Sequence, residues 1–236
     1  MAETPRLAHL MTLLFLGTGF AIVSGLLVVL YGTIRAKKLA ARLGGLLVLV
    51  SGGSYSLLLL GTGAVASDKT LPEGTWKYFC EPDCHIAYSI SSVRTAKVLG
   101  AETNLVQANG EFVVVRLKTW FDEHSIAKFR GNGPLTPVPR LVSLLDADGK
   151  RYFPMQFKPG TLDEVSIPLV QALRPGESYL TTFVFDLPDR ERDLRLLITD
   201  DDPISVLTID HENSPFHGKI YLRLNSGRQA ARLHIQ

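Results

Sequence analysis

The chain opens with two long apolar runs, AHLMTLLFLGTGFAIVSGLLVVLYGTI (residues 8–34) and LGGLLVLVSGGSYSLLLLGTGAVA (residues 43–66), which flank the basic connector RAKKLAAR (residues 35–42). Apart from His9, neither run contains an acidic or basic side chain. A helix needs about 20 residues to cross the hydrocarbon core of a bilayer, so both runs are long enough. Residues 1–66 are therefore predicted to form a two-helix transmembrane hairpin.

The connector sets the expected orientation of this hairpin. Its four basic side chains are Arg35, Lys37, Lys38 and Arg42. Positive charge in a short loop is typical of the cytoplasmic side of a membrane. We therefore expect a multi-pass protein of the bacterial inner (cell) membrane, with everything after residue 66 in the periplasm.

A signal sequence is the alternative interpretation of the second run. Ala64, Val65 and Ala66 make an A-x-A pattern like a signal-peptidase site, and basic residues precede the run. The apolar part of a signal sequence is usually about 7–15 residues long, and this run is longer. The sequence therefore favours an uncleaved second span.

Small residues recur at helical spacing in both runs. Gly17, Ala21 and Gly25 fall four apart on one face of the first run, and Gly52 and Ser56 do so in the second. Small residues at this spacing let helix backbones approach closely in lipid. Two interpretations are open: packing of the two helices against each other, and docking against another membrane protein.

Charge is divided unequally along the chain. Residues 1–66 contain five Lys or Arg and one Glu, a net charge of +4, whereas the remainder contains 20 Lys or Arg and 22 Asp or Glu, a net charge of −2. The near-neutral remainder lacks the basic patch of a nucleic-acid-binding protein. The expected partners are therefore the lipid bilayer and other membrane proteins, and not a nucleic acid.

Residues 67–78 are predicted to be a polar juxtamembrane linker, in which Pro72 and Gly74 disfavour regular structure. A soluble domain is expected over residues 79–236. Three aromatic residues near this boundary either rest at the headgroup level, where aromatic side chains are enriched, or begin the core of the domain. They are Trp76, Tyr78 and Phe79.

The domain consists of short β-rich runs separated by turn signals. In the clearest run, 111–121, apolar and basic side chains alternate, so one face is predicted to be buried and the other wet. The apolar face carries Val113, Val115, Leu117 and Phe121, and the basic face carries Arg116 and Lys118. Asn109-Gly110 and Asp146-Ala147-Asp148-Gly149 are predicted hairpin turns. The predicted strands are 93–99, 105–108, 111–121, 141–145, 151–157, 179–187, 194–198, 206–209, 220–224 and 231–235, a set that favours an antiparallel sandwich or barrel.

Four segments of this domain resemble the strands of a known family. They are GEFVVVRLKTWF (110–121), LLDADGKRYFP (144–154), LRPGESYLTTFVFDLP (173–188) and LRLLITD (194–200). Together they are similar to the immunoglobulin-like domains of unknown function found on bacterial lipoproteins and membrane-anchored surface proteins. The resemblance implies an all-β immunoglobulin-like antiparallel sandwich outside the cytoplasm, and it brings no catalytic residues.

The two cysteines of the chain lie four apart in FCEPDCH (residues 79–85). The compartment expected for this segment permits disulfides, and Pro82 favours a turn that brings the two sulfurs together. We therefore predict a disulfide between Cys80 and Cys84. Its ring is small, so it would give local rigidity more than global stability.

Three other interpretations of this segment are open. Cys-x-x-x-Cys-His is one residue longer than the usual haem attachment motif, in which His85 would be the proximal ligand. Soft thiolates and an imidazole would also suit copper or zinc bound by Cys80, Cys84 and His85. A redox-active dithiol is disfavoured by the flanking carboxylates Glu81 and Asp83, which oppose the thiolate.

Two more polar clusters contain residue types that bind calcium or catalyse hydrolysis. One is Asp200-Asp201-Asp202, and the other is Asp210-His211-Glu212-Asn213-Ser214 with His217. Neither has the spacing of a calcium loop or of a hydrolase motif, so the first is expected to be a solvated turn and the second a loop that is exposed or contacts a partner.

These features predict a non-catalytic accessory or stabilising subunit of a bacterial inner-membrane complex, with no cofactor. It would act through its transmembrane hairpin and its periplasmic sandwich. The alternative is an electron-transfer or metal-binding subunit that holds haem or copper through Cys80, Cys84 and His85.

Overall fold

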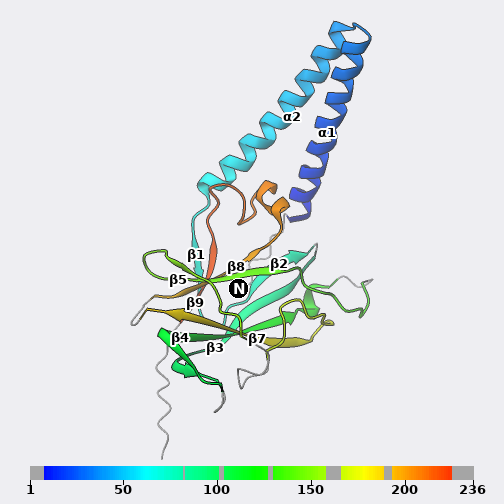
Figure 1. The fold of residues 1–236 in the computed structure, drawn as a ribbon. Coiled ribbons are helices and arrows are strands. Elements are labelled where there is room, and N and C mark those ends of the chain that lie inside the picture. Colours follow the sequence, from blue (N-terminus) through cyan, green and yellow to red (C-terminus); the bar gives the residue numbers. More distant parts are fainter. Residues whose placement is uncertain are drawn as a thin grey trace, which may run out of the picture. The chain divides into compact units, whose positions relative to one another are not determined.

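The structure is a computed structural model that describes residues 8–81, 83–100, 104–126, 130–157, 166–188 and 193–224. The chain forms two compact units, both drawn in Figure 1. The helical unit contains the two helices and the segment 202–219. The sandwich unit contains the strands from Lys69 to Asp201 and the strand that begins at Ile220. Segment 202–219, predicted as part of the domain 79–236, thus groups with the helices.

The helical unit begins with two antiparallel helices, α1 (Ala8–Ile34) and α2 (Lys38–Val65). The predicted bounds of the first helix are confirmed. The second helix begins five residues before the predicted residue 43, because residues 38–42 are Lys, Leu, Ala and Arg, which are strong helix formers.

The connector is correspondingly short, and the predicted loop 35–42 reduces to a turn at residues 35–37. Ala36 adopts a left-handed conformation with φ of 53°, and the Lys37 amide donates to the Gly32 carbonyl at 2.8 Å. A left-handed residue followed by such a bond commonly ends a helix. Lys38 and Arg42 therefore lie within α2.

The sandwich unit has nine strands in two sheets within the described part of the chain. The five-stranded sheet has the order β1-β9-β8-β5-β6, and the four-stranded sheet has the order β2-β3-β4-β7. The first sheet consists of β1 (Lys69–Leu71), β9 (Ile220–Arg223), β8 (Arg195–Asp200), β5 (Arg140–Leu145) and β6 (Arg151–Tyr152). The second consists of β2 (Lys77–Glu81), β3 (Asp83–Leu99), β4 (Val106–Phe121) and β7 (Ser178–Leu187). The described residues also include the 3-10 helices η1 (Glu123–Ser125), in this unit, and η2 (Pro203–Leu207), in the helical unit.

The pairing of β1 with β9 corrects the prediction of a purely antiparallel sandwich. These two strands are parallel, with Lys69 opposite Ile220, while the other strand pairs are antiparallel. Both strands begin where the chain leaves the helical unit, β1 after α2 and β9 after segment 202–219. They therefore run in the same direction.

The predicted linker 67–78 is more regular than expected, since it contains β1 and the start of β2. Between them the Thr75 amide donates to the Pro72 carbonyl at 3.2 Å. Phe79 is buried in the core, and Trp76 packs on Trp120 with ring centroids 5.1 Å apart. The interpretation that these aromatic residues begin the core is confirmed for Phe79.

The main core lies between the two sheets. The predicted apolar face of β4 is confirmed, because Val113, Val115, Leu117 and Phe121 all belong to this core. The opposite face of β4 is only partly wet, which corrects the prediction. Phe112 and Val114 are buried there in a second cluster, against which Phe157 packs.

Asn109-Gly110 does not form a hairpin turn, contrary to the prediction, and lies inside β4. The register between β3 and β4 shifts at this point, so the dipeptide forms an irregularity within the strand. The Asp186 carboxylate accepts from the Asn109 amide (2.9 Å), the Asn109 side chain (2.8 Å) and the Gly110 amide (3.2 Å). The irregularity leaves the amides of Asn109 and Gly110 without a carbonyl acceptor on the neighbouring strand. The carboxylate of Asp186 in β7 accepts from both.

Replacing Asp186 with Ala is expected to lower the free energy of unfolding by about 1 kcal/mol at neutral pH, because three hydrogen bonds to a partly exposed carboxylate are lost. Burial alone would raise the pKa of Asp186, but the bonds from Asn109 and Gly110 outweigh it and lower the pKa below 3.8. The contribution is therefore present above pH 3.8 and disappears as the pH falls through the lower, folded-state pKa. Denaturant titration of the full chain in detergent, followed by tryptophan fluorescence at several pH values, measures it. Asp148→Ala, at an exposed turn, is the matched control, and equal losses in the two variants would contradict the assignment.

Among the other predicted turns and strands, one hairpin is confirmed and one strand is wrong. The Asp146–Gly149 hairpin is confirmed, with Gly149 at φ of 80° and the Asp146 carboxylate accepting from the Lys150 amide at 2.8 Å. The predicted strand 206–209 is wrong, since η2 and a turn occupy these residues. Pro203 and the Asp202 cap favour the 3-10 helix there. The predicted strand 231–235 lies outside the described residues.

Candidate membrane-associated site

The two helices meet at three buried glycines, Gly25, Gly32 and Gly44. A Cβ atom on Gly44 would lie 2.6 Å from the Gly25 carbonyl oxygen and 2.8 Å from the Val29 amide nitrogen. A Cβ on Gly32 would lie 2.5 Å from the Ala41 amide nitrogen. These obstacles are backbone atoms, so the helices can approach this closely only without side chains at the contact.

The small residues singled out in the sequence are not all at this contact. Gly25 is there, and a Cβ on Gly52 would lie 3.8 Å from the Ile22 side chain. A Cβ on Gly17 would meet no atom of another segment within 4 Å, Ala21 is half-buried and Ser56 is exposed. Gly32 and Gly44 were missed. Positions equidistant from the connector, such as 32 and 41, face each other, but this pairing alone does not distinguish Gly44 from Gly45.

The outer surface of the hairpin is apolar and exposed. Phe20 is 76% exposed, Leu49 73% and Leu57 75%. Both helices are long and apolar enough to cross a membrane, and few of their residues are buried. A soluble domain rarely exposes so large an apolar surface, which makes the two helices candidate membrane spans.

Segment 202–219 returns to the end of α2, where Figure 1 draws it in orange beside the helices. The Tyr55 hydroxyl donates to the Leu207 carbonyl at 2.6 Å. A Cβ on Gly63 would collide with the Pro215 carbonyl, so this helix position accepts the segment only as glycine. The Lys219 amide donates to the Asp68 carboxylate at 2.8 Å, which joins the two ends of the helical unit.

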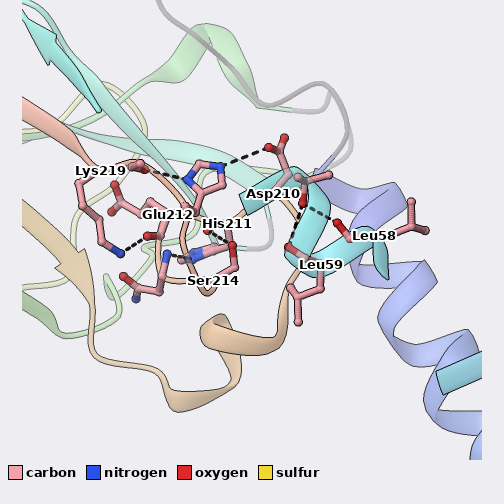
Figure 2. Close-up of polar contacts among 11 residues, drawn as sticks. Leu58, Leu59, Asp210, His211, Glu212, Ser214 and Lys219 are labelled. Carbon is pink, nitrogen blue, oxygen red and sulfur yellow. Dashed lines mark hydrogen bonds and ion pairs between the residues drawn. The ribbon is translucent and has the colours of Figure 1, made fainter. Parts of the chain in front are cut away.

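The polar residues of this segment bind one another within the turn (Figure 2). His217 places Nε2 3.3 Å from the Asp210 carboxylate and Nδ1 2.7 Å from the Gly218 carbonyl. The Ser214 hydroxyl donates to the His211 carbonyl at 2.7 Å, and the Lys219 ammonium donates to the Glu212 carbonyl. Ser214 therefore faces a main-chain oxygen and not an imidazole, so these residues are arranged to hold a turn.

The three consecutive aspartates also separate in the structure. Asp200 forms an ion pair with Arg140. Asp202 caps η2 by accepting from the Ile204 amide at 2.9 Å. Among the described residues, no three side chains of His, Cys, Asp or Glu converge as a metal site would require.

Cys80 lies in β2 and Cys84 in β3, on the two arms of one antiparallel hairpin. The register places Phe79 opposite Ile86 and Glu81 opposite Asp83. The side chains of both cysteines lie outside the described part of the structure. The disulfide, and the metal or haem site with His85, therefore stay predictions.

His85 itself is buried and held by its neighbours. Its Nδ1 lies 2.7 Å from the Ser125 hydroxyl, and its ring stacks on Phe121 at 5.5 Å. The Ser125 hydroxyl donates to the Asp122 carbonyl at 2.7 Å, so it accepts from His85, whose proton is thereby assigned to Nδ1. A metal bound by His85 would have to use Nε2.

Asp122 links this histidine to the start of β2. Its carboxylate accepts from the Tyr78 hydroxyl at 2.8 Å and from the His124 amide at 2.9 Å. Burial, together with the bond to the Asp122 carboxylate, raises the pKa of Tyr78 to about 12. Tyr78 therefore stays protonated and donates to Asp122, a bond that connects the β2 strand of the cysteine hairpin to the residue that follows β4.

Comparison with protein-family models finds no match, and comparison with curated protein sequences finds none. Among solved structures, the secreted protein MPT63 of Mycobacterium tuberculosis is similar with a TM-score of 0.41 and 11% identity, over 67% of this chain and 99% of that one. A β-sandwich protein of Clostridium difficile 630 is similar with a TM-score of 0.39 and 13% identity, over 68% of this chain and 96% of that one. At these scores the similarities carry no functional argument, and the assignment of a β-sandwich rests on the two sheets of the chain itself.

Proposed function

We propose that this chain is a membrane-anchored, non-catalytic accessory or stabilising subunit of a bacterial inner-membrane protein complex. The apolar exterior of the hairpin is the observation that supports the proposal most. The helices contact each other through Gly25, Gly32 and Gly44 and leave their large apolar side chains outward. Such a surface is stable in lipid or against another membrane protein.

The proposed orientation places the connector in the cytoplasm and the sandwich in the periplasm. Arg35 and Lys37 in the turn and Lys38 and Arg42 at the start of α2 supply the positive charge that the cytoplasmic side favours. A reporter enzyme that is active only outside the cytoplasm, fused after Gln236, is expected to be active. Activity of a cytosol-dependent reporter at the same position would reverse the orientation.

Two features favour a role in binding another membrane protein over a catalytic role. The helix face that carries Gly17 has open space, which leaves room for the backbone of a neighbouring helix. The sandwich resembles immunoglobulin-like domains of bacterial surface proteins, and that resemblance brings no catalytic residues. The hairpin would then bind laterally within the membrane, while the sandwich covers part of the partner's periplasmic surface.

The test is the native mass of the protein after extraction from membranes in a mild detergent. We expect a complex larger than one chain, which Gly17→Leu dissociates because the leucine fills the face left for the partner. Gly19→Leu is the matched control, since Gly19 is equally open and faces the other side of α1. A mass of one chain in the parent protein would contradict the proposal.

A further inference from the structure

We infer that the segment from Pro203 to Phe216 is a membrane-inserting element, which enters the lipid bilayer beside the end of the hairpin. The inference deepens the proposed function and rests on the hairpin being in the membrane. It concerns four exposed apolar side chains of the helical unit. They are Ile204, Val206, Leu207 and Phe216.

Four large apolar side chains of the segment are exposed while several polar ones are buried, with Ile209 (buried) and Asp210 (exposed) as the exceptions. Phe216 is 77% exposed and Ile204 54%, whereas Ser214 is 3% and Glu212 9% exposed. Loops in water show the opposite distribution, because exposed apolar groups cost free energy and charged groups prefer solvent. A surface of this kind fits an apolar medium outside the protein.

Polar groups of the segment's backbone also have hydrogen-bond partners within the protein, as an apolar medium requires. The Asp202 carboxylate accepts from the Ile204 amide, the Asp202 carbonyl from the Ser205 hydroxyl at 2.5 Å, and the Tyr55 hydroxyl donates to the Leu207 carbonyl. In lipid, polar groups must find partners within the protein, since no water is available. Side chains thus supply partners that the short 3-10 helix lacks.

The position of Tyr55 identifies the lipid as the apolar medium. Tyr55 lies in the apolar run 43–66, ten residues before the end of α2, which corresponds to about 15 Å along the helix axis. The bond from Tyr55 holds η2 alongside this run and not beyond it. Any bilayer that covers the hairpin at this level also reaches η2.

Phe216 shows that the outward orientation has a conformational cost. Its φ of 63° is in the left-handed region, which a bulky side chain rarely adopts. The next residue fixes this turn, because the His217 amide donates to the Ser214 carbonyl at 3.2 Å. The ring is therefore held outward by the turn that also binds Asp210 to His217.

Quenching of tryptophan fluorescence by brominated lipids tests the inference on the full chain in vesicles. The native Trp76 and Trp120 are replaced by Phe, and single tryptophans are introduced by Phe20→Trp in α1, Phe216→Trp in the segment, and Phe153→Trp in the sandwich. All three phenylalanines are more than half exposed. We expect Phe216→Trp to be quenched at least about twofold more than Phe153→Trp, as an interfacial element that enters the acyl boundary would be.

The three positions separate the two possible failures. If Phe20→Trp is not quenched, the hairpin is not in the bilayer and the proposed function fails. If Phe20→Trp is quenched while Phe216→Trp is quenched no more than Phe153→Trp, only the membrane-inserting segment is refuted. Ile204→Trp repeats the measurement at η2 and is expected to follow Phe216→Trp, so that a misfolded single variant does not decide the outcome.

Discussion

A leucine in place of Gly44 is expected to separate α1 from α2 and to destabilise the hairpin by about 3 kcal/mol, because an over-packed contact cannot relax without moving backbone. The Cβ of any larger residue would lie 2.6 Å from the Gly25 carbonyl oxygen. No rotamer of the side chain avoids this collision, since the Cβ position is fixed by the backbone. The helices must therefore move apart, whatever the shape of the new side chain.

Cross-linking between the helices measures this separation. Cysteines introduced by Ile22→Cys and Gly52→Cys, in a chain without Cys80 and Cys84, lie close enough for a short thiol-specific cross-linker. Gly44→Leu is expected to lower the initial rate of cross-linking at least about tenfold. Gly45→Leu, one residue away, is the matched control because a Cβ on Gly45 would meet nothing within 4 Å. Equal rates in the two variants would show that the close approach at Gly44 is not real.

The contrast between Gly44 and Gly45 also shows which features of this fold can be predicted from the sequence and which cannot. Hydrophobic length alone predicted both helices, and the alternation in β4 predicted its core face, since these signals lie within one segment. Which of two adjacent glycines faces the other helix depends on the relative rotation of the helices. That rotation is set by contacts between segments, so a four-residue spacing found Gly25 and missed Gly32 and Gly44.

The returning segment was missed for a related reason. Tyr55 and Leu207 are 152 residues apart, and no local pattern connects them. The cluster 210–214 has its polar partners within the segment 202–219 itself. Asp200 was expected in a turn but ends β8 and pairs with Arg140 of β5. Similarly, Asn109-Gly110 is a strong turn signal, and only Asp186 of β7 shows why it remains within a strand.

Replacing Asp200 with Ala is expected to lower the free energy of unfolding of the sandwich by about 3 kcal/mol, because a buried guanidinium loses its carboxylate. The Arg140 side chain is 1% exposed and lies 4.1 Å from the centroid of the Phe79 ring. The Lys77 ammonium lies 4.9 Å from the same ring. Two buried cations thus share one aromatic ring, and Asp200 supplies negative charge beside them.

Lys77 and Arg140 also make contacts between the two sheets, so the substitution of Asp200 is expected to destabilise the whole sandwich. Lys77, from β2, donates to the carbonyls of Ile198 at 2.6 Å and Ile220 at 3.0 Å, which belong to the other sheet. Denaturant unfolding of the full chain in detergent reports on this unit, because both tryptophans of the chain, Trp76 and Trp120, lie in it.

A substitution at the neighbouring Asp201 tests whether the loss of stability comes from the buried ion pair or from removing any acidic side chain at this point in the chain. Asp201 is exposed, so Asp201→Ala is expected to change the free energy of unfolding by less than about 0.5 kcal/mol. Removing both charges in Arg140→Met with Asp200→Leu is expected to recover most of the loss, since a buried pair replaced by apolar groups is often neutral. If Asp200→Ala costs no more than Asp201→Ala, the ion pair does not stabilise the sandwich. If the double variant is as unstable as Asp200→Ala, the loss arises from packing and not from the isolated charge.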